Sequence, residues 1–192
     1  MPELVERASE SAESFALAIL TTDLVPKTVT TVVKLSGGEA RITGISKGSG
    51  MIHPNMATML GYMITDVEVP LGLAQDLLVD AVNVSFNMIS VDGDTSTNDC
   101  CFLMANGASG VMIKTVEDLA AFKAALIDVA KTLAQAIAID GEGATKLIEV
   151  HVKGAPDLAT ARKAARGVTL SPLVKSAIHG EDPNWGRILA RM

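Results

Sequence analysis

The sequence predicts an α+β fold in which helices and strands form layers. Two observations lead to this prediction. β-Branched runs at 28–35 and 39–45 flank Ser36-Gly37-Gly38, a pattern typical of a β-hairpin. Two long segments, 70–89 and 116–139, carry apolar residues at helical spacing. Since neighbouring strands look joined by hairpins rather than by helical crossovers, a layered α+β arrangement fits better than a doubly wound parallel sheet.

The other elements follow from periodicity and composition. We expect a helix over 2–20, strands over 59–65, 100–105 and 146–152, a short basic helix over 156–166, and two helical pieces within 170–192 around a loop at 179–185. The long helices have recognisable starts, with Pro70 opening the first and Thr115 to Asp118 capping the second. No internal repeat divides the chain, so residues 1–192 are expected to form one α/β body.

Composition excludes several classes of partner. The net charge of −6 and the scattered Lys and Arg residues leave no basic stripe, so we expect no nucleic acid. Cys100 and Cys101 are adjacent and are the only cysteines, which indicates a reducing compartment rather than a disulfide framework. No apolar run is long enough for a membrane span, and the acidic N-terminus resembles no targeting peptide. We therefore expect a cytoplasmic protein.

A glycine-rich loop, KGSGMIHPNMAT at 47–58, precedes a buried strand. Glycines allow the backbone to approach a ligand closely, but most such loops are only turns. The loop lacks the Lys-Ser/Thr pair of a phosphate-binding P-loop. Taken alone, Thr58 would be explained by the β-propensity of threonine at a strand entrance.

Four motifs together carry a resemblance. KGSGMIHPNMATML, SFNMISVDGDTSTND, DGEGATK and GEDPNWGRI resemble, in this order, the signatures of the ornithine acetyltransferase family, the glutamate N-acetyltransferases of arginine biosynthesis. The resemblance covers most of the chain. It implies a layered αββα architecture of the N-terminal-nucleophile type, incomplete here at both ends. Residues 1–57 would match the end of the family's α-chain and 58–192 the start of its β-chain.

The resemblance also implies a reaction. Family members cut themselves at a bond that corresponds to Ala57–Thr58, and the freed threonine transfers an acetyl group from N²-acetylornithine to glutamate through an ester. No cofactor is implied, although acetyl-CoA is a possible acetyl donor. The chemistry is coherent, since a threonine hydroxyl needs a base and an N-terminal α-amine, with a pKa of about 7.7–8.0, can serve as one.

Two charged residues match the family's substrate-binding positions. Lys47 would bind the substrate α-carboxylate, and Glu142 would bind its ammonium group. The alternatives are a solvated loop lysine and a carboxylate in the turn after a helix. Substrate-binding residues are thus expected to be Lys47, Thr58 and Glu142.

The acidic loop VDGDTSTND at 91–99 does not fit a calcium site. Position six counted from Asp92 is Thr97 rather than Gly, and position twelve is Leu103 rather than Glu. We interpret the loop as a hydrogen-bonding scaffold behind the nucleophile. The three histidines show no metal-ligand spacing, so no metal is expected, and His53 receives no role.

Departures from the family keep two other functions open. The family's oxyanion hole lies in a Ser-Thr-Gly stretch that would precede Met1, and a substrate-binding Asn would follow Met192. We therefore expect impaired activity for this chain alone, and association into an oligomer or with the missing segments through Ile188 and Leu189. One rival is an N-terminal-nucleophile aminopeptidase, and the other is an uncleaved, non-catalytic chain that binds amino acids or a complementary chain.

Overall fold

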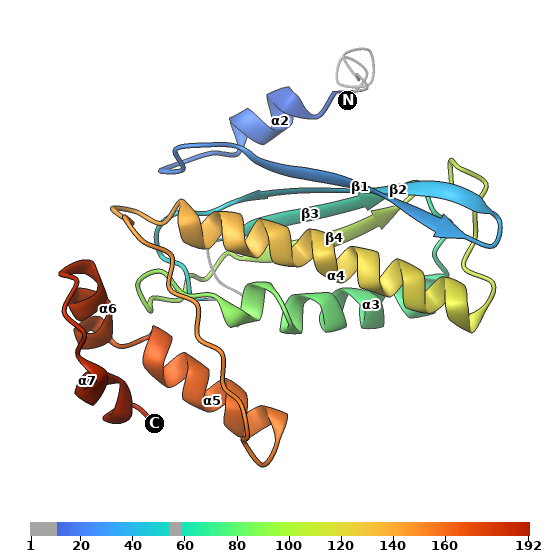
Figure 1. Ribbon diagram of the computed structural model, residues 1–192. Helices are drawn as coiled ribbons and strands as arrows, with labels where there is room; N and C mark the ends of the chain where they lie inside the picture. Colours follow the sequence, from blue (N-terminus) through green and yellow to red (C-terminus); the bar gives the residue numbers. More distant parts are fainter. Residues whose placement is uncertain (1–10, 54–58) are drawn as a thin grey trace.

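A four-stranded mixed sheet with helices packed on one face organises the molecule (Figure 1). The computed structural model describes residues 11–53 and 59–192. The strands are β1 (Lys27–Leu35), β2 (Gly38–Lys47), β3 (Leu60–Thr65) and β4 (Cys100–Ala105). They lie in the order β1-β2-β3-β4, with β1–β2 and β2–β3 antiparallel and β3–β4 parallel. The predicted α+β class is confirmed.

The helices follow the predicted order. They are α2 (Glu13–Ala18), α3 (Leu71–Asn83), the 3₁₀ turn η1 (Phe86–Met88), α4 (Val116–Ile139), α5 (Leu158–Thr169), α6 (Pro172–His179) and α7 (Trp185–Leu189). The first long helix is shorter than predicted, because α3 ends at Asn83 and the chain continues as a turn. Of the helix predicted over 2–20, residues 1–10 lie outside the described residues.

The hydrophobic core lies between the sheet and α3 and α4. Phe122, Leu126 and Ile137 of α4 and Met63 of β3 are fully buried there. α4 approaches β2 closely at Gly44, where an added Cβ would lie 2.5 Å from Val129 Cγ1 and 2.7 Å from Leu133 Cδ1. This contact fixes α4 along the middle of the sheet, with its C-terminal end towards the loop that leaves β2.

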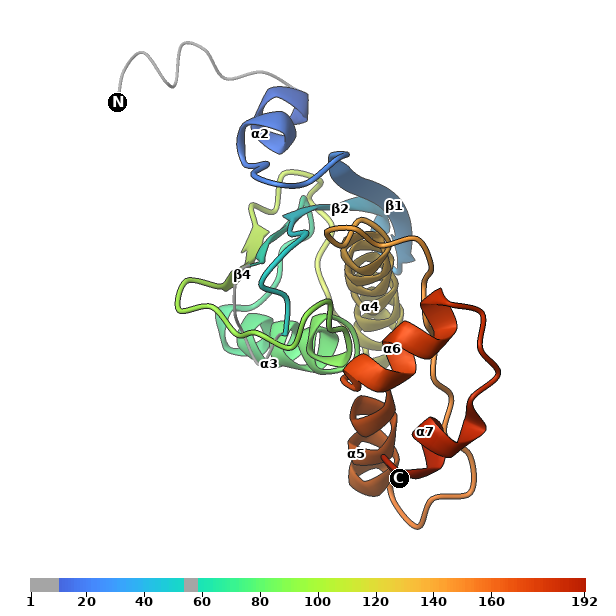
Figure 2. The same cartoon turned by 90° about the vertical axis from the view of Figure 1, so that its left-hand side faces the viewer.

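The opposite face of the sheet is only partly covered. α2 lies on that side, as the turned view in Figure 2 shows. The Phe15 ring of α2 meets the Tyr62 ring edge-on with centroids 4.9 Å apart, and Tyr62 stacks on Phe102 at 5.6 Å. Val32 and Met104 on the same face are exposed. The sheet is therefore packed on one face and partly open on the other.

The hairpin end of the sheet is tied to the start of α4. Thr115 and Asp118 form the predicted capping box. The Asp118 carboxylate also accepts hydrogen bonds from Ser36 N at 2.6 Å, Ser36 Oγ at 2.7 Å and Lys114 N at 3.1 Å. The bonds from Ser36, backbone first, lower the pKa of Asp118 to about 2. One carboxylate thus joins the β1–β2 turn to a helix N-terminus.

The strand predicted over 146–152 is wrong. This segment pairs with no strand among the described residues and runs beside α5 before turning into it (Figure 1). Its alternating pattern is compatible with a strand, but a strand forms only where a neighbouring edge completes its hydrogen bonds. The basic helix and the two C-terminal helical pieces are confirmed as α5, α6 and α7, with Asp157, Ser171 and Asn184 as their N-caps.

Candidate functional site

Three strand ends meet at the edge of the sheet opposite the hairpin turn. β2 ends at Lys47, β3 begins at Leu60 and β4 begins at Cys100, and the register places Leu60 beside both of the others. The glycine-rich loop leaves β2 here and returns into β3. Its described flanks are His53 and Met59, whereas the predicted cleavage residues Ala57 and Thr58 lie outside the described residues.

The acidic loop fastens the first half of the glycine-rich loop. Asp92 accepts hydrogen bonds from Met51 N at 2.6 Å and Ile52 N at 3.1 Å. Val91 N donates to Ile52 O at 2.7 Å, and the Thr95 hydroxyl donates to His53 O at 3.2 Å. Met51 adopts a positive φ of 54°, a conformation that L residues rarely adopt without support. The scaffold interpretation is confirmed for this part of VDGDTSTND.

A buried ionic network holds the loop where it leaves β2. Lys27 Nζ lies 2.7 Å from Asp23 Oδ1 and 2.6 Å from Asp140 Oδ2. Asp23 also accepts Gly48 N at 2.6 Å. Burial opposes ionisation of Asp23, but the hydrogen bonds from Lys27 and Gly48 outweigh it and lower the pKa of this carboxyl. The sequence analysis missed the network, because its members are far apart along the chain.

Lys47 is buried at this edge, with only 9% of its surface exposed. Its ammonium group donates to Thr21 Oγ1 at 3.2 Å and forms no ion pair with any described carboxylate. The alternative of a solvated loop lysine is therefore wrong. A buried cation held by one hydroxyl is well suited to an anionic ligand.

Glu142 contacts the same loop. Its backbone N–H donates to Ser49 O at 3.0 Å, while the Ser49 hydroxyl donates to Asp140 O at 2.6 Å. Its carboxylate rests on Gly50, where an added Cβ would lie 2.5 Å from the carboxyl carbon. The side chain is exposed and follows α4 closely, so the turn-carboxylate alternative stays open. Lys47 and Glu142 are thus separated by only a short loop segment.

Asp99 is a residue that sequence reasoning did not single out. Both of its carboxylate oxygens are buried, and neither makes a well-formed hydrogen bond with the described residues. Burial raises the pKa of Asp99 to about 7, although the nearby Met59 N–H and the Lys47 charge partly offset that effect. It directly precedes Cys100, whose N–H donates to Met59 O at 3.2 Å. An uncompensated carboxyl therefore lies beside the start of β3.

His53 contacts two segments. Its Nδ1 lies 3.2 Å from the Ser90 hydroxyl and its Nε2 lies 2.9 Å from an Arg166 guanidinium nitrogen. Burial, and then the Arg166 charge, lower the pKa of His53, so the imidazole is held in the neutral form. These contacts give it a structural role in joining the glycine-rich loop to α5.

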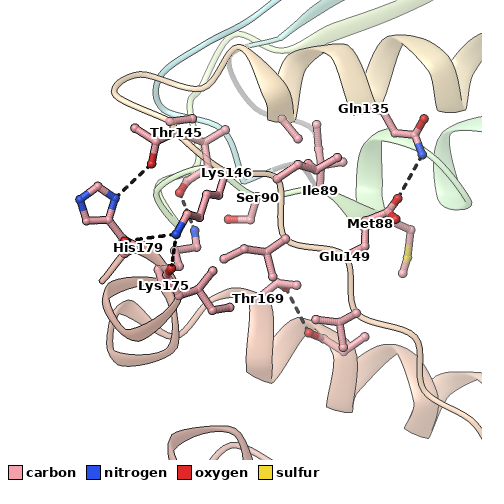
Figure 3. Close-up of a pocket in the computed structure, with 18 of the residues that line it drawn as sticks. Met88, Ile89, Ser90, Gln135, Thr145, Lys146, Glu149, Thr169, Lys175 and His179 are labelled. Carbon is pink, nitrogen blue, oxygen red and sulfur yellow. Dashed lines mark hydrogen bonds between the residues drawn. The ribbon is translucent and has the colours of Figure 1, made fainter. Parts of the chain in front are cut away.

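A cleft of about 420 Å³ lies beside this edge, between residues 142–151 and helices α5 and α6. Figure 3 shows Lys146 and Thr145 reaching towards α6, where Thr145 Oγ1 lies 3.1 Å from His179 Nδ1. Glu142 lines the cleft, but Lys47 and Asp99 do not. The cleft cations Arg166 and Lys175 donate to the backbone carbonyls of Asn87 and Val91. These two cations are thus already used by the protein.

No helix in the described part of the chain is both long and apolar enough to cross a membrane. Curated relatives resemble the chain over most of its length. A protein of Chlorobaculum tepidum named arginine biosynthesis bifunctional protein ArgJ is 55% identical over 175 residues, which are 91% of this chain and 43% of that protein. A Sorghum bicolor protein with the same name, marked chloroplastic, is 52% identical and is matched over 42% of its length by 98% of this chain. The chain therefore spans less than half the length of these relatives.

A solved structure agrees with the fold. The crystal structure of arginine biosynthesis bifunctional protein ArgJ from Bacillus halodurans superposes with a TM-score of 0.67 at 47% sequence identity. The match covers 70% of this chain and 64% of that one. The ArgJ family model matches residues 1–192. Fold, motifs and relatives agree, and the chain belongs to the ArgJ family.

Proposed function

We propose that this chain carries the acetyl-transfer centre of an arginine-biosynthesis enzyme, with Thr58 as nucleophile after self-cleavage at Ala57–Thr58. The observation that supports the proposal most is the meeting of Lys47, Glu142 and the two described flanks of the cleavage segment at one sheet edge. Family membership supports the same chemistry, because the relatives are named as bifunctional proteins of arginine biosynthesis.

The proposed cycle has two balanced halves. The Thr58 hydroxyl attacks the acetyl carbonyl carbon of N²-acetylornithine, the Thr58 α-amine takes the hydroxyl proton, and that proton passes to the leaving ornithine nitrogen. The acetyl group is then an ester on Thr58. The amine of glutamate attacks the ester, and the proton it loses returns to the threonine oxygen. Thr58 is regenerated without any cofactor, and acetyl-CoA can replace N²-acetylornithine as donor.

Charges at the site would position the substrate. Lys47 attracts the α-carboxylate, and its burial strengthens the attraction because little water screens it. Glu142, whose carboxylate contacts Gly50, attracts the side-chain ammonium of ornithine. Two opposite charges at one short loop suit a zwitterionic amino acid better than a long peptide. This arrangement favours the transferase over the aminopeptidase.

Substitution of the nucleophile tests the proposal. Thr58→Ala, expressed with its native flanking sequence, should lose both self-cleavage and acetyl transfer, while Thr58→Ser should keep part of each. Cleavage is followed by mass spectrometry, transfer by formation of N-acetylglutamate, and peptidase activity by release of amino acids from short peptides. Normal turnover by folded Thr58→Ala protein would remove the nucleophile assignment, and peptide hydrolysis without transfer would favour the rival enzyme.

A further inference from the structure

The C-terminal helices lie outside the main hydrophobic core. In the described part of the chain, the residues of that core lie within 33–137, and α5, α6 and α7 contribute none of them. These helices lie on the helical side of the sheet (Figures 1 and 2). Arg166 of α5 donates to Asn87 O at 2.7 Å, and Lys175 of α6 donates to Val91 O at 2.5 Å. A few polar contacts can therefore decide how firmly this part of the molecule is held.

His53 adds a contact between the glycine-rich loop and α5. Its Nε2 lies 2.9 Å and its Nδ1 lies 3.2 Å from the same guanidinium nitrogen of Arg166, Nη2. Nδ1 also lies 3.2 Å from the Ser90 hydroxyl, which donates to Ile52 O at 3.3 Å. The imidazole thus lies between a cation on α5 and a hydroxyl just before the acidic loop.

Only the neutral imidazole fits these contacts. A guanidinium can only donate, so the ring must offer Arg166 a lone pair. Because the Ser90 proton is directed to Ile52 O, the Ser90 oxygen can accept from Nδ1–H, and Nε2 is then the acceptor for Arg166. A second proton on the ring would point an N–H at the Arg166 N–H and would bring two positive charges into contact.

The charged groups around His53 come from three elements. Burial is the largest cause that lowers the pKa of His53 below its ordinary value of 6.5, and the charge of Arg166 on α5 is the next. Lys175 on α6 acts in the same direction, whereas Asp92 and Asp94 of the acidic loop oppose it. The imidazole would therefore take up a proton more readily once α5 has moved away from it.

We propose that His53, Ser90 and Arg166 form a pH-sensitive latch, in which neutral His53 holds α5 against the glycine-rich loop and protonated His53 releases it. Only a proton is exchanged with the solvent, so the step needs no other reactant. Ser90 and Arg166 also line the cleft of about 420 Å³, so release of α5 loosens one wall of that cleft. The latch does not depend on the proposed chemistry of Thr58.

The sign of the pH dependence follows from proton linkage. The released form binds the proton more tightly than the latched form, because release removes both the burial and the Arg166 charge. The latch should therefore contribute its full stability above pH ~6.5, the ordinary pKa of histidine, and should lose it as the pH falls below that value.

Hydrogen–deuterium exchange measures how often α5 opens. The 192-residue chain is exchanged at pH 5.0 to 7.5, and mass spectrometry follows peptides from 158–169. Dividing each exchange rate by the intrinsic rate at the same pH gives an opening constant. Peptides from α4, which belongs to the core, serve as the internal reference.

Three proteins are compared: the parent, His53→Gln and His179→Gln. In His53→Gln the side-chain amide can still accept from Arg166 and donate to Ser90, but it does not titrate. His179→Gln is the matched control, because His179 contacts Thr145 at the same cleft from α6. The comparison therefore separates the titration of His53 from that of another histidine on the C-terminal helices.

The opening constant of α5 in the parent should rise by up to ~30-fold between pH 7.5 and pH 5.0, since the released imidazole titrates near 6.5. His179→Gln should show the same rise, whereas His53→Gln should show none, and α4 should stay level in all three proteins. A level opening constant in the parent, or the parent's rise retained in His53→Gln, would overturn the proposal. A rise that disappears in His179→Gln would assign the response to His179 and would overturn it equally.

Discussion

Asp118 and Asp99 lie at opposite ends of the same sheet and have opposite surroundings. Asp118 accepts hydrogen bonds from Ser36 and from the Lys114 N–H just before α4, and these bonds lower its pKa to about 2. Asp99 makes no well-formed hydrogen bond with the described residues, and burial raises its pKa to about 7. Burial alone therefore does not decide what a carboxylate does. Available donors decide whether it stabilises the fold or stays ready to exchange a proton.

The two ends of the sheet differ in the same way beyond these two residues. The hairpin end is built from neighbouring segments whose polar groups satisfy one another. At the other end, the network of Lys27, Asp23 and Asp140 is complete, whereas Lys47 keeps one hydroxyl partner and the Asp99 carboxylate makes no well-formed hydrogen bond with the described residues. The ionic network of Lys27, Asp23 and Asp140 thus stabilises the end of the sheet where Lys47 and Asp99 are left with few partners. Its stabilisation offsets the energetic cost of burying those two charged groups.

Removing the cation of the buried ionic network should have the largest effect on stability. Lys27→Met leaves the carboxylates of Asp23 and Asp140 buried without their cation, and the free energy of unfolding should fall by ~3–5 kcal/mol. Urea unfolding measures this loss. Lys34→Met is the control, because Lys34 lies on the same strand but pairs with Glu39 at the exposed hairpin end. This substitution should lower the free energy of unfolding by less than ~1 kcal/mol. Equal losses for both variants would mean that the network does not hold the site.

Removing the charges of Lys47 and Glu142 should affect substrate binding rather than stability. Lys47→Ala and Glu142→Ala should each raise the KM for N²-acetylornithine roughly ten- to hundredfold, because charge-assisted contacts contribute ~1.5–3 kcal/mol. Steady-state kinetics of acetyl transfer measure the change, and Lys34→Ala provides an exposed control. A parent-like KM for both variants would show that neither residue holds the ends of the substrate.

The two aspartates should give smaller stability effects of opposite sign at pH 8. The folded pKa of Asp118 is below that of the unfolded chain, so its contribution is present above pH 4 and is lost as pH falls through about 2. The folded pKa of Asp99 is raised, so its charge destabilises increasingly as pH rises from about 4 through 7. Asp118→Asn should therefore lower the Tm at pH 8, and Asp99→Asn should raise it.

Thermal unfolding at pH 8 and pH 4 separates the two cases. The gain from Asp99→Asn should be largely lost at pH 4, where the folded carboxyl is neutral and the unfolded one is only about half ionised, while the loss from Asp118→Asn should persist. If Asp99→Asn lowers the Tm at both pH values, its carboxylate is paired rather than free.

Local patterns were sufficient to predict most of the fold. Periodicity and capping gave the hairpin, β3, β4 and α4, because these signals depend on residues close in sequence. The strand over 146–152 failed, because strand formation depends on a distant partner that local alternation cannot reveal. For the same reason the contact between Lys27 and Asp140, which are 113 residues apart, could not be predicted from local sequence patterns.

The site was predicted in part, and the motif resemblance rather than periodicity supplied it. Lys47 was recognised from its motif, but its burial was not foreseen. Asp92 and Asp99 look equivalent within VDGDTSTND, yet Asp92 binds the backbone of the neighbouring loop, whereas Asp99 makes no well-formed hydrogen bond with the described residues. Only tertiary contacts distinguish them. The assignments of Ala57 and Thr58 stay predictions, since both lie outside the described residues.

The parallel pairing of β3 with β4 has a consequence for the order of folding. The β1–β2 hairpin closes over a two-residue turn, whereas Leu60 and Cys100 meet only after the intervening crossover through α3 has formed. Such distant contacts form late, because a long loop must lose its freedom first. Asp99 and Met59 come together only through this pairing. The end of the sheet that holds Lys47 and Asp99 should therefore be completed after the hairpin end.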